Sequence, residues 1–123
     1  MRLAALVTSL TDRQRTGQAG EDDALAHLRQ HGLSLVERNF RCKGGELDLV
    51  MQEGRTLVFV EVRKRADARH GGAAASITAA KQKRLIRAAQ TFLLRHPVPP
   101  PCRFDVIAID GGALSWLKNA FHW

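Results

Sequence analysis

The sequence is poor in cysteine and aromatic residues and has no long apolar run. Its two cysteines, Cys42 and Cys102, form no CxxC spacing, and its five histidines form no HExxH or C2H2 pattern, so we expect no structural zinc site. No stretch approaches the about 20 apolar residues of a membrane span, and the apolar run at residues 3–7 lacks a small-residue cleavage site. We therefore expect a cytoplasmic protein with free thiols and no membrane contact.

Acidic residues are outnumbered by basic ones. The chain has 19 Lys and Arg against 12 Asp and Glu, a formal net charge of +7. This excess favours a polyanionic partner, because Lys and Arg release counterions when they bind phosphates. A basic, soluble surface without a partner explains the same charge. Aromatic residues make up 6% of the chain, too few for the stacking platform of single-strand binders.

The apolar periodicity predicts a single α/β domain at residues 17–123, after a flexible N-terminal segment at residues 1–16. Its element order is αβββαββ, with no internal repeat. In chain order, we expect a helix at 17–31, a strand at 33–36, a basic loop at 38–45, strands at 46–51 and 56–63, a mobile loop at 66–76, a helix after the N-cap Thr78, and strands at 103–109 and 113–118.

Carboxylates gather on one face of the two central strands. If their hairpin closes through two or four residues around Glu53 and Gly54, Asp48 faces Phe59 on the partner strand. Asp48 and Glu61 then become diagonal neighbours about 7 to 8 Å apart, where they could share a divalent cation. A three-residue loop would place them on opposite faces, so the prediction depends on the register.

The first helix supplies a third acid. Glu21 extends the apolar stripe of that helix, and a carboxylate on a core-facing stripe needs a partner. A Mg²⁺ ion held by one or two carboxylates, water and a substrate phosphate would satisfy these acids and could cleave a phosphodiester. An ion-pair network with Arg41, Arg63 or Arg65 explains the same pattern.

Basic side chains are concentrated at the start of the second helix, where backbone N–H groups already attract anions. They could bracket a phosphate backbone, although such runs also form solvated helix faces. Gln82 lines up with the apolar stripe of that helix and is a candidate for orienting water or phosphate. The candidate nucleic-acid-binding residues are Arg41, Lys43, Arg65, Lys81, Lys83 and Arg84.

Several motifs together resemble the bacterial YraN family, a widespread group of uncharacterised proteins. The resemblance runs from about residue 17 to the C-terminus. It is carried by GE at 20–21, GGELDLV at 44–50, VFVEVR at 58–63, GGA at 71–73, KQK at 81–83, RFDV at 103–106 and NAF at 119–121.

That family is similar in turn to the PD-(D/E)XK nucleases, particularly the archaeal Holliday-junction resolvases. The similarity implies a restriction-endonuclease-like αβββαβ core, in which helices flank a mixed central sheet. It makes Asp48 the motif aspartate, Glu61 the acid of the E-x-K element and Glu21 the helix-borne acid. It also implies that Asp48 and Glu61 bind Mg²⁺ or Mn²⁺, and that the protein works as a homodimer on DNA.

The chain departs from the superfamily at Arg63, which stands where E-x-K has lysine. Arginine can stabilise charge on the phosphate, but it is always protonated and differently shaped. The leading hypothesis is a metal-dependent endonuclease acting on DNA, in particular structured or branched DNA. The alternatives are a nucleic-acid-binding module that has lost cleavage, and an interaction protein in a repair or recombination assembly.

Overall fold

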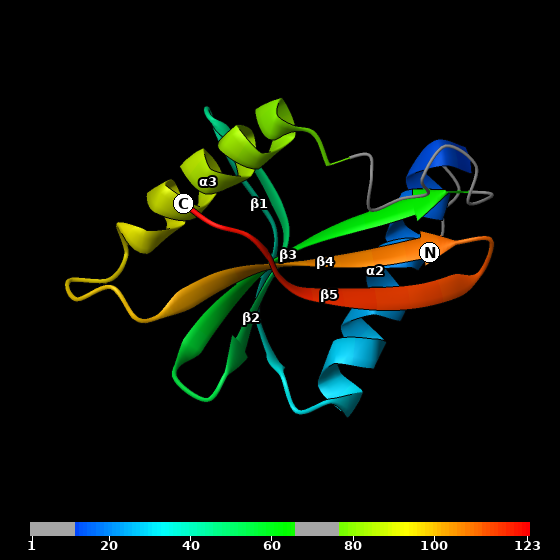
Figure 1. The fold of residues 1–123 in the computed structure, drawn as a ribbon, viewed down its shortest axis with the longest axis horizontal. Helices are drawn as coiled ribbons and strands as arrows, with labels where there is room; N and C mark the ends of the chain where they lie inside the picture. Colours follow the sequence, from blue (N-terminus) through cyan, green and yellow to red (C-terminus); the bar gives the residue numbers. More distant parts are fainter. Residues whose placement is uncertain (1–11, 66–76) are drawn as a thin grey trace, which may run out of the picture.

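The computed structural model describes residues 12–65 and 77–123. The predicted order αβββαββ is confirmed (Figure 1). The N-terminal segment at 1–11 and the loop at 66–76, both predicted to be mobile, lie outside the described residues. The elements are α2 at Asp12–Gln30, β1 at Ser34–Cys42, β2 at Gly45–Glu53, β3 at Thr56–Arg65, α3 at Ala79–Leu93, β4 at Cys102–Asp110 and β5 at Ala113–Phe121.

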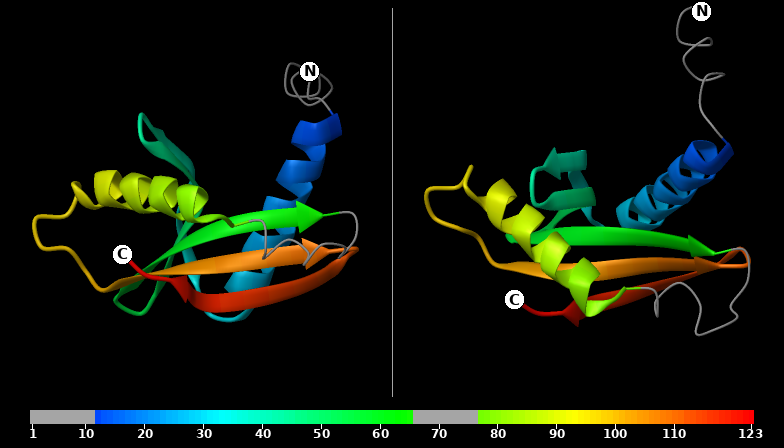
Figure 2. Two further views of the ribbon diagram at one scale, coloured as in Figure 1. Left: turned by 45° about the horizontal axis from the view of Figure 1, so that its top comes forward. Right: turned by 90° about the horizontal axis from the view of Figure 1, so that it is seen from above.

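The strands form one mixed sheet in the order β1-β2-β3-β4-β5. β3 and β4 are parallel and α3 connects them, whereas the other neighbouring pairs are antiparallel. The two helices lie on opposite faces of the sheet (Figure 2). This arrangement agrees with the predicted αβββαβ core with helices flanking a mixed sheet.

Each face of the sheet has its own apolar core. On the α3 side, Phe92 of the helix packs with Val50, Phe59 and Phe104. On the α2 side, Leu28 packs with residues such as Val58. The central strands β3 and β4 are buried on both faces, so their apolar runs are nearly continuous, as is typical of a parallel pair. No helix in the described part of the chain is both long and apolar enough to cross a membrane.

The first strand and the first helix are longer than the sequence predicted. The predicted basic loop at 38–45 is wrong, because β1 continues to Cys42 and pairs with β2 as far as Cys42↔Gly45. An edge strand tolerates polar residues because the ladder satisfies its backbone on one side and water does so on the other. α2 begins at Asp12, so part of the segment expected to be flexible is helical.

The hairpin between β2 and β3 has an even number of loop residues, as predicted, but its strand pairing is displaced by two residues from the predicted one. Glu53 pairs with Thr56 around Gly54, whose φ is 59°. A glycine with positive φ at the first position of a two-residue loop is favoured in hairpins. Val50 therefore faces Phe59, and the ladder ends at the pair Leu49↔Val60, directly before Asp48 and Glu61. The predicted pairing of Val50 with Leu57 is therefore wrong by two residues.

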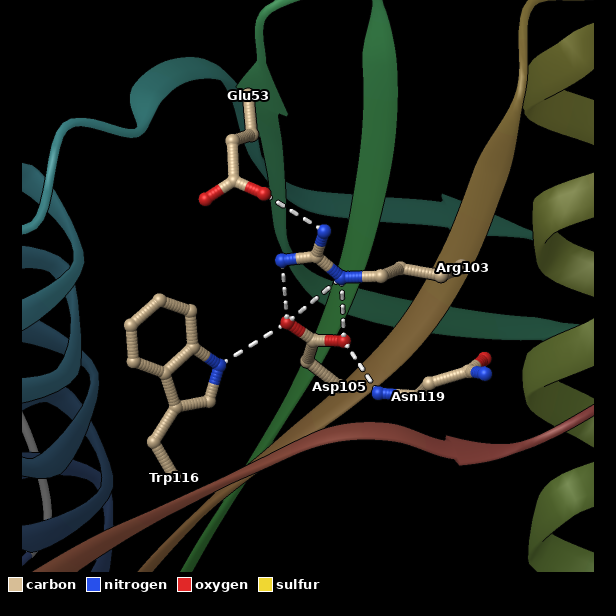
Figure 3. A network of polar contacts seen from close by, with 5 residues as sticks. All are labelled: Glu53, Arg103, Asp105, Trp116 and Asn119. Atoms are coloured by element: carbon tan, nitrogen blue, oxygen red, sulfur yellow. Dashed lines mark hydrogen bonds and ion pairs between the residues drawn. The ribbon is translucent and has the colours of Figure 1, made fainter.

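A polar network centred on Asp105 ties β4 to β5 (Figure 3). Asp105 is fully buried, and its carboxylate accepts hydrogen bonds from Arg103 Nε at 3.0 Å, Trp116 Nε1 at 3.0 Å and the Asn119 backbone N–H at 2.9 Å. Arg103 also bonds Glu53 at 2.7 Å. The register of β4 and β5 shifts beside Asp105, and Asn119 has a φ of 53°. The carboxylate therefore satisfies a backbone group that the ladder leaves unpaired.

Candidate active site

Asp48 of β2 and Glu61 of β3 come together where the ladder between their strands ends. The last pair in that ladder is Leu49↔Val60. Beyond it, the Val62 backbone N–H donates to Asp48 Oδ2 at 2.9 Å. Glu61 is only 4% exposed, and its carboxyl is within hydrogen-bonding distance of Asp48. The side chain of Asp48 thus replaces a ladder bond and meets a second, buried carboxyl.

Strand alternation breaks at the same place. Simple alternation predicted Leu47 on the same face as Leu49, but Leu47 packs in the α3-side core with Val50, while Leu49 lies in the α2-side core. This part of the prediction is wrong. At this place the partner strand β1 is irregular, because Asn39, between the pairs Arg38↔Leu49 and Phe40↔Leu47, has a φ of 54°.

The carboxyl of Glu61 has a raised pKa. Burial, a hydrogen bond with Asp48 and the charge of Asp48 raise the pKa of Glu61 to about 9. Lys81 in the first turn of α3 opposes this rise, since its Nζ lies 3.1 Å from Glu61 Oε2. Two carboxyls thus share one site with an ammonium at its edge. Lys81 was predicted to contact nucleic acid, and its contact with Glu61 was not predicted.

Glu21 lies near this pair but is tied to another residue. Its Oε1 is 3.4 Å from Arg38 Nη2, which also contacts Asp22 Oδ1 at 2.9 Å. Burial and the charge of Asp48 raise the pKa of Glu21, and Arg38 opposes them. Glu21 therefore shares the electrostatic field of Asp48 while an arginine neutralises its charge. The partner was missed because Arg38 was assigned to a loop, where strand pairing could not place it.

The donor set fits a divalent cation held by two protein carboxylates. Within residues 12–65 and 77–123, no group of three or more His, Cys, Asp or Glu side chains is arranged to hold a metal. A cation would therefore rest on Asp48 and Glu61, with water and substrate phosphate completing its shell, as Mg²⁺ commonly does. A proton shared by two carboxyls is the group that such a cation would displace.

The other predicted catalytic residues, Arg63 and Gln82, lie on β3 and α3. Arg63 follows Glu61 by two residues on β3, is partly buried and makes its own polar contact. The Gln82 amide donates to the Ile77 carbonyl at 3.4 Å, so its contact lies within the start of α3. The side chain of Arg65 lies outside the described residues.

Most of the predicted nucleic-acid-binding residues meet beside the carboxyl pair. Arg41, Lys43, Lys81 and Arg84 line one cavity between the β1–β2 turn and α3. Arg41 also forms an exposed ion pair with Glu46 at 3.6 Å, a contact worth little in water. Lys83 is exposed and does not line the cavity.

The protonated Glu61 predicts an unusual pH dependence of stability. With a pKa of about 9, the folded protein keeps a proton on Glu61 across neutral pH, whereas the unfolded chain releases it near the ordinary glutamate pKa of 4.5. The free energy of unfolding should therefore fall as the pH rises between those values. Glu61→Gln should remove this slope, making the variant more stable than the native protein at pH 8 in metal-free buffer.

Urea unfolding at pH 5, 6.5 and 8 measures that slope. The matched control is Glu37→Gln, which makes the same change at a carboxylate paired with Arg95 at 2.7 Å. The control should keep the native slope. Equal slopes in the native protein and Glu61→Gln would mean that Glu61 is ionised in the fold.

Comparison with known proteins identifies close relatives. A family model described as "Uncharacterised protein family UPF0102" matches residues 20–109. The chain is 70% identical over 112 residues to a UPF0102 protein of Herminiimonas arsenicoxydans, covering 91% of this chain and 90% of that one. It is 64% identical over 122 residues to a UPF0102 protein of Janthinobacterium sp. (strain Marseille), covering 99% of both chains.

Proposed function

This chain belongs to the UPF0102 family, as its YraN-like motifs predicted, and we propose from the geometry of its site that it is a metal-dependent, endonuclease-like protein acting on DNA. One observation carries the proposal. The buried carboxyl of Glu61 meets Asp48 on one side and the ammonium of Lys81 on the other, next to a basic cavity. Strongly perturbed acids in such a setting are typical of functional sites.

Asp48 and Glu61 would hold Mg²⁺ or Mn²⁺. When bound, the ion supplies an activated water and neutralises charge that develops on the phosphate. The basic residues that line the cavity would position the DNA strand and surround it with positive charge. Glu21 adds negative charge near Asp48 and would assist in attracting the cation.

Lys81 would supply the compact ammonium that Arg63 cannot. An ammonium and a guanidinium are not equivalent at a tight site, because the latter is planar and needs a wider approach. Lys81 Nζ already lies 3.1 Å from Glu61 Oε2 although it comes from α3. Arg63, two residues after Glu61 on β3, would stabilise charge from the strand. The departure from E-x-K is thus compatible with cleavage.

A second candidate function is nucleic-acid binding without cleavage. It is favoured by the contacts of Glu21 with Arg38 and of Glu61 with Lys81, which give both acids a partner without a metal. Under this proposal the carboxyl pair is structural and the basic cavity is the working surface. A DNA partner, a cytoplasmic location and a homodimer are shared by both proposals, the dimer because a symmetric junction requires two cuts or two contacts.

Cleavage of labelled duplex, flap and four-way-junction DNA distinguishes the two functions. The native protein is incubated with Mg²⁺, with Mn²⁺ or with EDTA. Cleavage that requires the metal supports the endonuclease, and the preferred substrate shows whether branched DNA is its target. Tight binding without cleavage of any substrate selects the binding module.

Metal binding should also stabilise the native protein. At a Mn²⁺ concentration about tenfold above its Kd, we expect Tm to rise by about 5 °C, because a ligand that binds only the folded state stabilises it. Asp48→Asn should abolish the rise, and Glu37→Gln, the control away from the site, should keep it. Differential scanning fluorimetry measures the shift. The same rise in both variants would place the metal elsewhere.

A further inference from the structure

A cavity of about 370 Å³ lies between the β1–β2 turn and the first turns of α3. It is separate from the carboxyl pair but shares Lys81 with it. The side chains that matter for its chemistry are Arg41, Lys43, Lys81, Arg84 and Glu46.

Two glycines in the β1–β2 turn allow α3 to form one wall of the cavity. A Cβ at Gly45 would lie 2.5 Å from the Arg84 carbonyl oxygen, and a Cβ at Gly44 would lie 3.2 Å from Arg87 Cβ. The first separation is impossible without moving the helix backbone. Glycine at these positions therefore lets the turn and the helix bring basic side chains from both elements to one place.

The cavity has the chemistry of an anion site. Four cationic side chains line it against one carboxylate, and that carboxylate, Glu46, is already paired with Arg41. α3 has no acidic residue in its first turn, and Thr78 caps it by accepting the Lys81 backbone N–H at 3.1 Å. The positive end of the helix dipole adds to the charge of the side chains.

We propose that this cavity binds one phosphate of a nucleic-acid strand. The choice of nucleic acid over another phosphate compound rests on the proposed function, whereas the anion site itself does not. Because Lys81 both lines the cavity and contacts Glu61, a strand held there passes beside the carboxyl pair. The cavity thus sets the position of the strand relative to Asp48 and Glu61.

Two neighbouring cations allow a matched test. Arg84 lines the cavity, whereas Lys83 is exposed and does not. Arg84→Ala and Lys83→Ala each remove one positive charge from the same helix, so general attraction to DNA falls equally. Alanine also keeps the Arg84 Cβ and backbone that pack on Gly45. Lys43→Ala, in the exposed turn, is a second cavity variant that does not touch α3.

Binding of labelled single-stranded DNA is measured by fluorescence anisotropy in EDTA, at several salt concentrations. Arg84→Ala and Lys43→Ala should each weaken binding about tenfold and lower the salt slope by about 0.7, the value for one contact with a single strand. Lys83→Ala should weaken binding less than about twofold. Equal weakening by Lys83→Ala and Arg84→Ala would mean diffuse attraction and would overturn the proposal.

Inorganic phosphate provides a probe without nucleic acid. In ¹⁵N–¹H spectra, titration with phosphate should shift the Gly44 and Gly45 amides in the native protein and not in Arg84→Ala. Unchanged glycine amides would also overturn the proposal. Strands with a 5′-phosphate and a 5′-hydroxyl separate the two phosphate sources, since tighter binding of the former identifies a terminal phosphate and equal binding an internal one.

The two proposals can fail independently. Arg84→Ala and Lys43→Ala test the cavity in EDTA, where no metal-dependent cleavage takes place. Lack of cleavage by the native protein would remove the endonuclease proposal and leave the cavity untouched. Loss of the difference between Arg84→Ala and Lys83→Ala would remove the cavity proposal, whatever the cleavage assay finds.

Discussion

Asp48→Asn and Glu61→Gln are each expected to reduce metal-dependent DNA cleavage about a thousandfold, since a catalytic metal contributes several kcal/mol of charge stabilisation. We expect both substitutions to leave the fold in place. Asparagine keeps an oxygen that can accept the Val62 N–H. Glutamine has the shape of protonated Glu61. The raised pKa of Glu61 favours this protonated form in the metal-free protein. The variants thus remove the charges that a cation needs and retain the shape of the site.

Single-turnover cleavage of the preferred DNA substrate in Mn²⁺ measures this effect. Glu53→Gln is the control, because Glu53 is a partly exposed carboxylate that pairs with Arg103 at the other end of β2. The Glu53→Gln variant should cleave the substrate at a rate within about twofold of that of the native protein. Native-like cleavage by Asp48→Asn would show that this pair is not the catalytic centre, even if the protein is a nuclease.

Asp105→Ala is expected to lower the free energy of unfolding by about 3 to 5 kcal/mol, the cost of removing one partner from a buried charged pair. Asp105 is 0% exposed. Its loss leaves the Arg103 guanidinium, the Trp116 Nε1–H and the Asn119 N–H without their acceptor. Three donors then lose their bonds in a region where water cannot replace all of them.

Urea unfolding monitored by tryptophan fluorescence measures the loss. The control is Glu53→Ala, which removes the other partner of Arg103, at a side chain that is 38% exposed. It should cost less than about 1 kcal/mol, as exposed ion pairs do. Similar costs for both variants would mean that the network is no more than a surface ion pair. Metal binding at Asp48 and Glu61 should survive in either variant that folds.

The element order and the shared face of Asp48 and Glu61 could be predicted from the sequence. Side chains alternate with a period of two, so an even loop between two strands sets both acids on one face wherever the turn begins. Which residues pair across an even loop could not be predicted, because glycine is suited to the first position of a two-residue loop as well as to the second. The observed turn begins at Gly54, and Val50 therefore pairs with Phe59 instead of Leu57.

The partners of the acids could not be predicted for a different reason. Lys81 reaches Glu61 and Arg38 reaches Glu21 through long, flexible side chains on elements distant in the sequence. Their contacts depend on how α3 and α2 lie across the sheet, which local propensity does not encode. Asp105 shows the same limit, since one more acid in an apolar strand gives no sign of its Trp116 and Asn119 partners.

The sequence by itself therefore determined the family, the order of the elements and the acids on the central hairpin, because these follow from local periodicity and motif spacing. Only the tertiary structure decided which cations meet those acids, that the pKa of Glu61 is raised, and that four basic residues line one cavity. Charges interact through space, and a pKa depends on burial and on every charge nearby. Those quantities exist only once helices and strands have packed.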